Sequence, residues 1–65
     1  MDGNTRRKKI IEILEGRKKA ISGGDIAQML GVSRQVIVQD MALLRASDYD
    51  IISTTRGYLL SQTSQ

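Results

Sequence analysis

The stretch from Asp25 to Ile37, DIAQMLGVSRQVI, most strongly limits what this chain can fold into. Ile26, Ala27 and Leu30 recur at helical spacing on one face, and alanine is small enough for a second helix to cross closely. Gly31 follows the last apolar residue of that face, where a glycine readily takes a positive φ as a helix ends. The pattern predicts a short helix that stops in a tight turn.

The residues after the turn predict where a second helix begins. Val32 is apolar and fills the corner of the turn, and Ser33 belongs to the residue types preferred at a helix N-cap. Ile37 then anchors the second helix from its buried side. The two segments together predict a helix-turn-helix, whose second helix starts with polar groups able to reach into DNA.

Composition argues against most catalytic and metal-dependent functions. The 65 residues include no cysteine and no histidine, which removes disulfides, thiol nucleophiles, imidazole bases and the common zinc sites. A chain of this length is one small domain with little room for a deep catalytic pocket. We therefore predict a non-enzymatic domain that folds through its apolar core.

The charge balance suits a polyanionic partner, although the excess is modest. Ten Lys and Arg residues stand against seven Asp and Glu residues, for a net charge of +3. No apolar run approaches the roughly 18 residues that span a bilayer, and the basic N-terminus lacks the apolar core of a signal peptide. We expect a cytoplasmic protein without a membrane contact.

Helical patterns also flank the central motif. Asn4 or Thr5 is the predicted cap of a first helix that runs to about Glu15 and is stopped by Gly16. A basic turn follows, and then a possible short strand at residues 20–21. Ser22, three residues before Asp25, forms a variant capping box for the second helix. The second and third helices are predicted over residues 23–30 and 34–46, and Ile37, Met41 and Leu44 define the buried face of the third helix.

After Ser47 the pattern changes from helical to extended. Ile51 to Ser53 and Tyr58 to Leu60 read as two strands joined by a turn that contains Gly57. The predicted fold is therefore mostly α with a small β hairpin, a three-helix winged helix-turn-helix. The predicted domain covers residues 1–60, with the helix-turn-helix over about 23–46 and the wing over about 51–60. Residues 61–65 are predicted to be a polar tail or the start of a linker to an absent effector domain.

The third helix carries the side chains best suited to read double-stranded DNA. Arginine pairs with guanine and glutamine with adenine in the major groove, so Arg34, Gln35 and Gln39 are the candidate base contacts. Val38 lies on their flank and is a candidate contact to a thymine methyl group. Ser33 is the cap, and it lies where its hydroxyl or the first helical amides can hold a phosphate.

The predicted wing adds a second set of candidate contacts. Arg56, beside the wing glycine, is positioned for a minor-groove or backbone contact. Thr54 and Thr55 are lesser phosphate candidates.

Other interpretations of these residues remain open. The two glutamines also fit a solvated helix face, and Arg34 also fits an ion pair with Asp40. Asp40 itself reads as a structural acceptor, for Arg45 or a backbone amide, rather than as a catalytic carboxylate. The basic runs at residues 6–9 and 17–19 fit phosphate contacts and solvated faces equally well. Tyr58 reads as hairpin core rather than as a base-stacking residue.

Two longer motifs carry a family resemblance. The run GVSRQVIVQDMALLRASDYDII, followed by TTRGYLL, resembles the N-terminal winged helix of the niacin-responsive transcriptional repressors of Gram-positive and related bacteria. More broadly, the chain is similar to the small winged helix that opens biotin repressor and DeoR-type regulators. The resemblance covers nearly the entire chain and implies an operator-binding domain of a repressor.

The resemblance also implies a metal ion and an effector that bind in a domain other than this one. Members of the narrow family carry a C-terminal domain with three histidines, expected to bind a divalent metal ion and nicotinic acid. This chain has no histidine, so no cofactor is expected in it. It is either the excised DNA-binding domain of such a repressor or a domain that stands alone without effector sensing, and the polar residues 61–65 favour excision. We expect the full-length protein to be a homodimer. Two alternatives remain: a winged-helix protein-interaction module, or the N-terminal regulatory domain of a bifunctional enzyme such as a biotin ligase.

Overall fold

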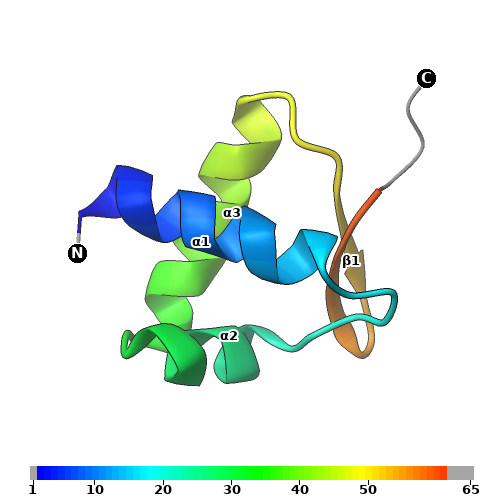
Figure 1. Ribbon diagram of the computed structural model, residues 1–65, viewed down its shortest axis with the longest axis horizontal. Helices are drawn as coiled ribbons and strands as arrows, with labels where there is room; N and C mark the ends of the chain where they lie inside the picture. The colour runs from blue at the N-terminus through cyan, green and yellow to red at the C-terminus, as the bar shows by residue number, and fades with distance from the viewer. Residues whose placement is uncertain (1, 62–65) are drawn as a thin grey trace.

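Three helices and a two-stranded hairpin make up residues 2–61, the part of the chain that this computed structural model describes (Figure 1). In chain order they are α1 (Gly3–Glu15), α2 (Gly23–Leu30), α3 (Arg34–Ala46), β1 (Ile51–Thr54) and β2 (Gly57–Leu60). The predicted winged helix-turn-helix class is confirmed, and the bounds of α2 and α3 agree with those expected. Residues 62–65 of the predicted polar tail lie outside the described residues. No helix within residues 2–61 is both long and apolar enough to cross a membrane.

The first helix begins earlier than the sequence pattern suggested. Asp2 is its N-cap, and a carboxylate oxygen of Asp2 accepts a hydrogen bond from the backbone N–H of Thr5 at 2.8 Å. The prediction of Asn4 or Thr5 as cap was wrong, because an aspartate one turn earlier satisfies the free amide and adds a favourable charge at the helix start. The same hydrogen bond lowers the pKa of Asp2.

The turn between α2 and α3 has the geometry predicted for it. Ser22 caps α2 by accepting from the amide of Asp25 at 3.0 Å, and Gly31 ends that helix with φ of 71°. The amide of Val32 donates back to the carbonyl of Ala27 at 3.0 Å. Ser33 then caps α3 by accepting from the amide of Val36 at 3.3 Å. The start of α3 is therefore held by local hydrogen bonds as well as by packing.

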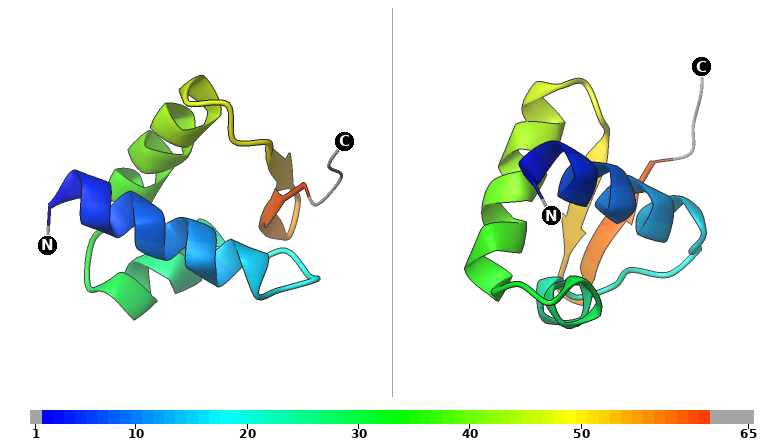
Figure 2. Two further views of the ribbon diagram at one scale, coloured as in Figure 1. Left: turned by 45° about the horizontal axis from the view of Figure 1, so that its top comes forward. Right: turned by 60° about the vertical axis from the view of Figure 1, so that its left-hand side comes forward.

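All three helices contribute to one apolar core. Figure 2 shows α1 lying across α2 and α3, with the hairpin near the C-terminal end of α1. The most deeply buried apolar side chains are Ile10, Leu14, Ile26, Ile37 and Met41. Val32 and Tyr58 pack against this core and are partly buried, as predicted for both.

A buried ion pair fastens α1 to α3. Asp40 is 1% exposed and accepts hydrogen bonds from Arg6, through its Nε and Nη2, and from Arg7 Nη1 at 3.1 Å. Burial works against the charged carboxylate, but the hydrogen bonds and charges of the two arginines outweigh it and lower the pKa of Asp40. Asp40 is a structural acceptor, as predicted, but the proposed partners Arg45 and a backbone amide were wrong.

The hairpin is fixed at its base and at its turn. Its strands are antiparallel, with Ile51 opposite Leu60 and Thr54 opposite Gly57, so the turn consists of Thr55 and Arg56. Arg45 Nε donates to the carbonyl of Ile51 at 3.2 Å, which explains why Arg45 does not reach Asp40.

The strand predicted at residues 20–21 is reduced to a single bridge. Ile21 and Tyr58 exchange two backbone hydrogen bonds, of 3.0 and 2.8 Å. Gly57 opens β2 with φ of 137°, and a Cβ at that position would lie 2.3 Å from the carbonyl oxygen of Ile21. The connection between α1 and α2 is therefore in direct contact with the wing.

Candidate nucleic-acid interface

The first turns of α3 present one exposed face. Arg34, Gln35, Val38 and Gln39 are all exposed, and Val38 retains 46% of its accessible surface. Residues four apart lie above one another on a helix, so these side chains form two adjacent rows. Ile37 lies on the opposite side of the helix, in the core. The fold thus brings together all four side chains that the sequence proposed for the major groove.

Ser33 has a free hydrogen-bonding capacity beside this face. Its hydroxyl oxygen accepts from the amide of Val36, which leaves the hydroxyl proton available for a phosphate oxygen. The first amides of α3 point in the same direction, because the N–H groups of the first turn have no acceptor within the helix.

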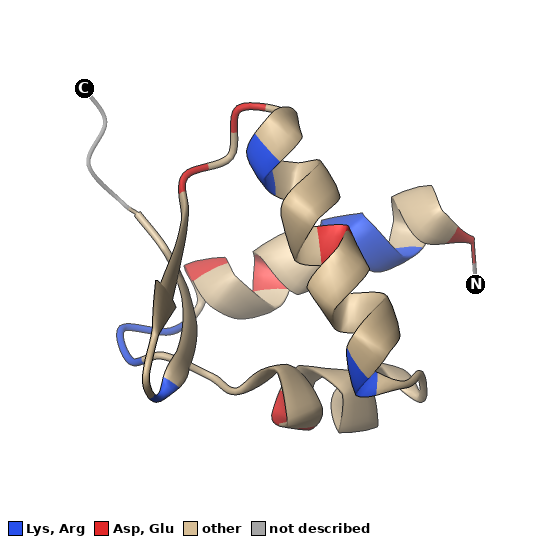
Figure 3. Cartoon of the chain, turned by 180° about the vertical axis from the view of Figure 1, so that it is seen from behind, with Lys and Arg blue, Asp and Glu red and all other residues tan. Residues whose placement is uncertain are grey.

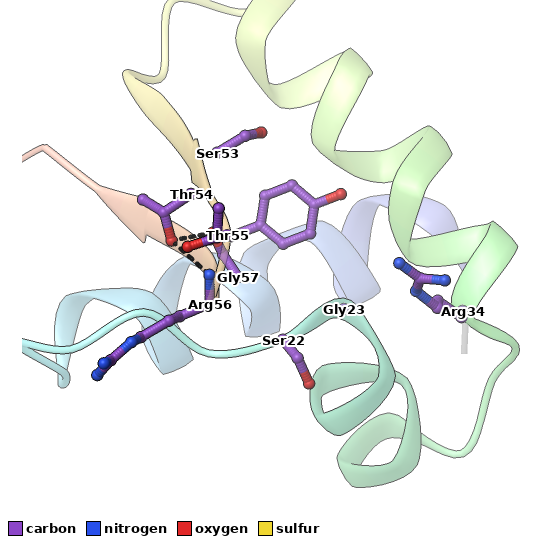
Figure 4. Close-up of a pocket in the computed structure, with 9 residues that line it drawn as sticks. Ser22, Gly23, Arg34, Ser53, Thr54, Thr55, Arg56 and Gly57 are labelled. Carbon is purple, nitrogen blue, oxygen red and sulfur yellow. Dashed lines mark hydrogen bonds between the residues drawn. The ribbon is translucent and has the colours of Figure 1, made fainter.

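Arg34 borders a cleft between α3 and the wing. The cleft has a volume of about 180 Å³ and is lined by Ser22, Gly23, Arg34, Tyr58 and residues 53–57. In Figure 4 the Arg34 side chain extends from the start of α3 toward the hairpin. The alternative ion pair with Asp40 does not form, and Arg34 has no ion pair within the described residues.

The absence of a side chain at Gly23 shapes this cleft. A Cβ on Gly23 would lie 3.3 Å from the ring carbon Cε2 of Tyr58 and 3.7 Å from Cγ of Arg34. The tyrosine ring and the arginine stem therefore both pack over the start of α2. Sequence reasoning assigned no role to Gly23, although a glycine pair after a helix cap is a signal of close approach.

The wing places its polar residues in distinct roles. The hydroxyl of Thr54 accepts from the amide of Arg56 at 3.1 Å and donates to the carbonyl of Gly57 at 3.0 Å. The hydroxyl proton of Thr54 is thus used in a hydrogen bond within the turn, whereas Thr55 and Arg56 are exposed at the tip. Figure 4 shows the Arg56 side chain extending away from α3. Arg34 and Arg56 thus border the same cleft, but the Arg56 side chain points away from α3.

Charge is distributed unevenly along α3. Figure 3 shows basic segments near both ends of α3 and at the hairpin turn, and acidic segments in the connection between α3 and β1. That connection contains Asp48 and Asp50, at the end of α3 opposite to Arg34. The end of the molecule that carries the wing tip is thus the more favourable one for a polyanion.

The described residues do not suit a bound metal ion. Within residues 2–61 no group of three His, Cys, Asp or Glu side chains is arranged to hold one. Since the sequence has no histidine and no cysteine, the divalent ion that the family resemblance implies does not fit these residues.

Comparisons with known proteins identify the family of this chain. The HTH domain family matches residues 6–59. The chain is 54% identical over 56 residues to the "probable transcription repressor NiaR" of Thermotoga maritima, covering 86% of this chain and 32% of that protein. It is 44% identical over 57 residues to the "transcription repressor NadR" of Bacillus subtilis, covering 88% of this chain and 32% of that protein. The chain thus spans about a third of the length of these two relatives.

Proposed function

Because the chain belongs to the HTH domain family, we propose that it is the sequence-specific, double-stranded DNA-binding domain of a bacterial transcription repressor. It occupies an operator and blocks transcription by binding alone, without catalysing a reaction. The observation that carries the proposal is the exposed face of α3, where two glutamines and an arginine lie on the outer side of a helix that is anchored from within.

The contacts divide into those that read bases and those that hold the backbone. Gln35 and Gln39 read adenine edges, Arg34 reads guanine, and Val38 meets a thymine methyl group. Ser33 holds a phosphate at the start of α3.

On the wing, Arg56 and Thr55 are the contacts that the turn leaves free. Thr54 supports them, since its hydroxyl proton is used within the turn. Phosphate contacts supply much of the affinity, so binding weakens steeply as salt rises.

The effector and the assembly belong to the longer protein. We infer that the repressor is cytoplasmic and responds to nicotinic acid, on the basis of the resemblance to niacin-responsive repressors and of the two repressor relatives. The divalent metal and the effector bind in residues outside this chain, where a homodimer contact is also expected.

A selection experiment tests the proposal. The 65-residue domain is incubated with a pool of randomised duplexes at two salt concentrations, and the retained DNA is sequenced while binding is followed by fluorescence anisotropy. We expect enrichment of one motif, and loss of that enrichment in Arg34→Ala and Gln35→Ala. If neither the domain nor a tethered dimer of it binds duplex DNA at low salt, the proposal fails and a protein-docking role replaces it.

A further inference from the structure

The connection between α1 and α2 carries three consecutive cations that the proposed DNA contacts do not use. Arg17, Lys18 and Lys19 are exposed, and within residues 2–61 none of them forms an ion pair. In the basic run at the start of α1, Arg6 and Arg7 are bound to Asp40, and Lys8 and Lys9 are exposed without an ion pair to any of residues 2–61. These three residues, 17–19, are called the basic connection. Their positive charges are unpaired within residues 2–61, and the position of the basic connection in the fold determines what it can bind.

The fold holds this connection against the wing. The backbone N–H and C=O groups of Ile21 are both hydrogen-bonded to the backbone of Tyr58. The backbone of Gly57 packs closely against the carbonyl group of Ile21. Figures 1 and 3 show the basic connection running beside the hairpin turn. Lys19 lies two residues before Ile21, so its backbone has little freedom to leave the wing.

Lys19 and the wing tip share one hollow. It has a volume of about 440 Å³ and is lined by Lys19, Ala20, Leu59 and residues 54–56. No acidic residue lines it, and it shares the wing residues Thr54, Thr55 and Arg56 with the cleft that Arg34 borders. Lys19, Arg56 and Thr55 therefore border one hollow, and none of its lining residues carries a carboxylate.

The two neighbouring cations have different surroundings. Lys18 and Arg17 border a hollow that Glu15 also lines, and Arg17 borders another with Asp25. A carboxylate near a cation competes with a phosphate for it. Among these three cations, Lys19 is therefore the one best placed for an anion.

We propose that Lys19, together with Arg56 and Thr55, binds a phosphate of the DNA backbone on the side of the wing that faces away from α3. This inference rests on the proposed DNA-binding function and extends its footprint beyond the base pairs that α3 reads. The contact is to the backbone only, so it adds affinity without sequence preference.

Salt dependence of DNA affinity tests this contact. Lys19→Gln and its neighbour Lys18→Gln remove the same charge from the same exposed loop, so each is the control for the other. The dissociation constant of each variant is measured by fluorescence anisotropy from 50 to 200 mM salt, on the selected motif with flanking duplex on both sides. Circular dichroism checks that both variants fold.

One phosphate contact contributes a slope of about 0.9 in the logarithm of affinity against the logarithm of salt concentration. Because Arg56 binds the same phosphate, we expect Lys19→Gln alone to lower the slope in part. The double variant Lys19→Gln with Arg56→Ala should remove about 0.9 of it, so that the salt-induced loss of affinity over this range falls about three- to fourfold. Lys18→Gln should keep the slope of the wild type. Equal slopes in the two variants, or an unchanged slope in Lys19→Gln, would overturn the Lys19 contact while leaving the DNA-binding function standing. Absence of binding by the wild type would instead remove both.

Discussion

At the scale of single residues, Gly57 is the glycine at which an added side chain would have the least room. Its φ of 137° is in a region that side chains rarely adopt, and a Cβ would lie 2.3 Å from a backbone oxygen of Ile21. The collision disappears only if the wing moves off the connection between α1 and α2, and the strain only if the backbone at residue 57 changes its φ.

We therefore expect Gly57→Ala to destabilise the domain by about 2 to 4 kcal/mol, seen as a lower midpoint of thermal unfolding. Gly24→Ala is the matched control, because Gly24 is an exposed helical residue whose Cβ would approach only the Ser22 hydroxyl, at 4.0 Å. That change should be neutral or stabilise by about 0.5 to 1 kcal/mol. Equal losses in the two variants would contradict the close approach at Gly57.

Two residues of α3 are expected to set base preference. Arg34→Ala and Gln35→Ala should each cost about 1 to 3 kcal/mol of binding free energy on the selected motif and relax its sequence preference. Arg56→Ala should lower affinity for all duplexes without changing the preferred motif.

Competition titrations with single-base variants of the motif measure this difference. Gln28→Ala, an exposed change on α2 away from the face of α3, is the control. If Gln28→Ala altered base preference as much as Gln35→Ala did, α3 would not be the reading helix.

At the scale of secondary-structure elements, the attachment of α1 to α3 depends on one carboxylate. The pKa of Asp40 is lower in the folded chain than in the unfolded one, because Arg6 and Arg7 hold its charged form. A lowered pKa stabilises the fold at pH values above the unfolded pKa of about 4, and this stabilisation is lost as the pH falls through the folded pKa.

Asp40→Asn should therefore destabilise the domain by roughly 3 kcal/mol at pH 7, since it leaves two arginines without their counter-charge. The difference in unfolding free energy between wild type and variant should shrink as the pH is lowered below about 4. Thermal unfolding of both proteins at pH 7, 5, 4 and 3 measures it. A difference that stays constant across this range would show that lost packing, rather than lost charge, explains the effect.

At the scale of the whole molecule, the domain presents one candidate DNA-reading helix and one wing, so we expect it to occupy a single half-site. Leu43 is 50% exposed on α3 and lies outside the core, so this residue is available for a contact between copies. The chain spans about a third of its two relatives, and we propose that the remaining part of the repressor pairs two such domains.

If the operator is a palindrome, its half-sites should lie about 10 to 10.5 base pairs apart, or a multiple of that distance. Inserting about five base pairs between the half-sites turns one of them to the opposite side of the duplex. We expect this insertion to weaken binding of the longer protein by at least tenfold and to leave the isolated 65-residue domain unaffected, as measured by anisotropy titration. An equal effect on both would mean that these residues pair by themselves.

Local sequence signals were sufficient for α2, α3 and the hairpin, but they gave the wrong cap for α1 and a strand at residues 20–21 that is only a bridge. Gly31 after an apolar helical face, Ser22 and Ser33 as caps, and the change of pattern after Ser47 predicted α2, α3 and the hairpin, because caps and turns depend on residues a few positions apart. The placement of Arg34, Gln35, Val38 and Gln39 on one exposed face followed from helical spacing alone.

Tertiary structure decided the contacts between distant residues. The sequence offered several acceptors and several cations, and only the crossing of α1 over α3 selected Arg6 and Arg7 for Asp40, 34 and 33 residues away. Likewise, the bridge between Ile21 and Tyr58 decided that the basic connection lies beside the wing. Charge pairing depends on the distance between two groups in space. That distance is set by how the helices pack and not by how far apart the residues are in the sequence.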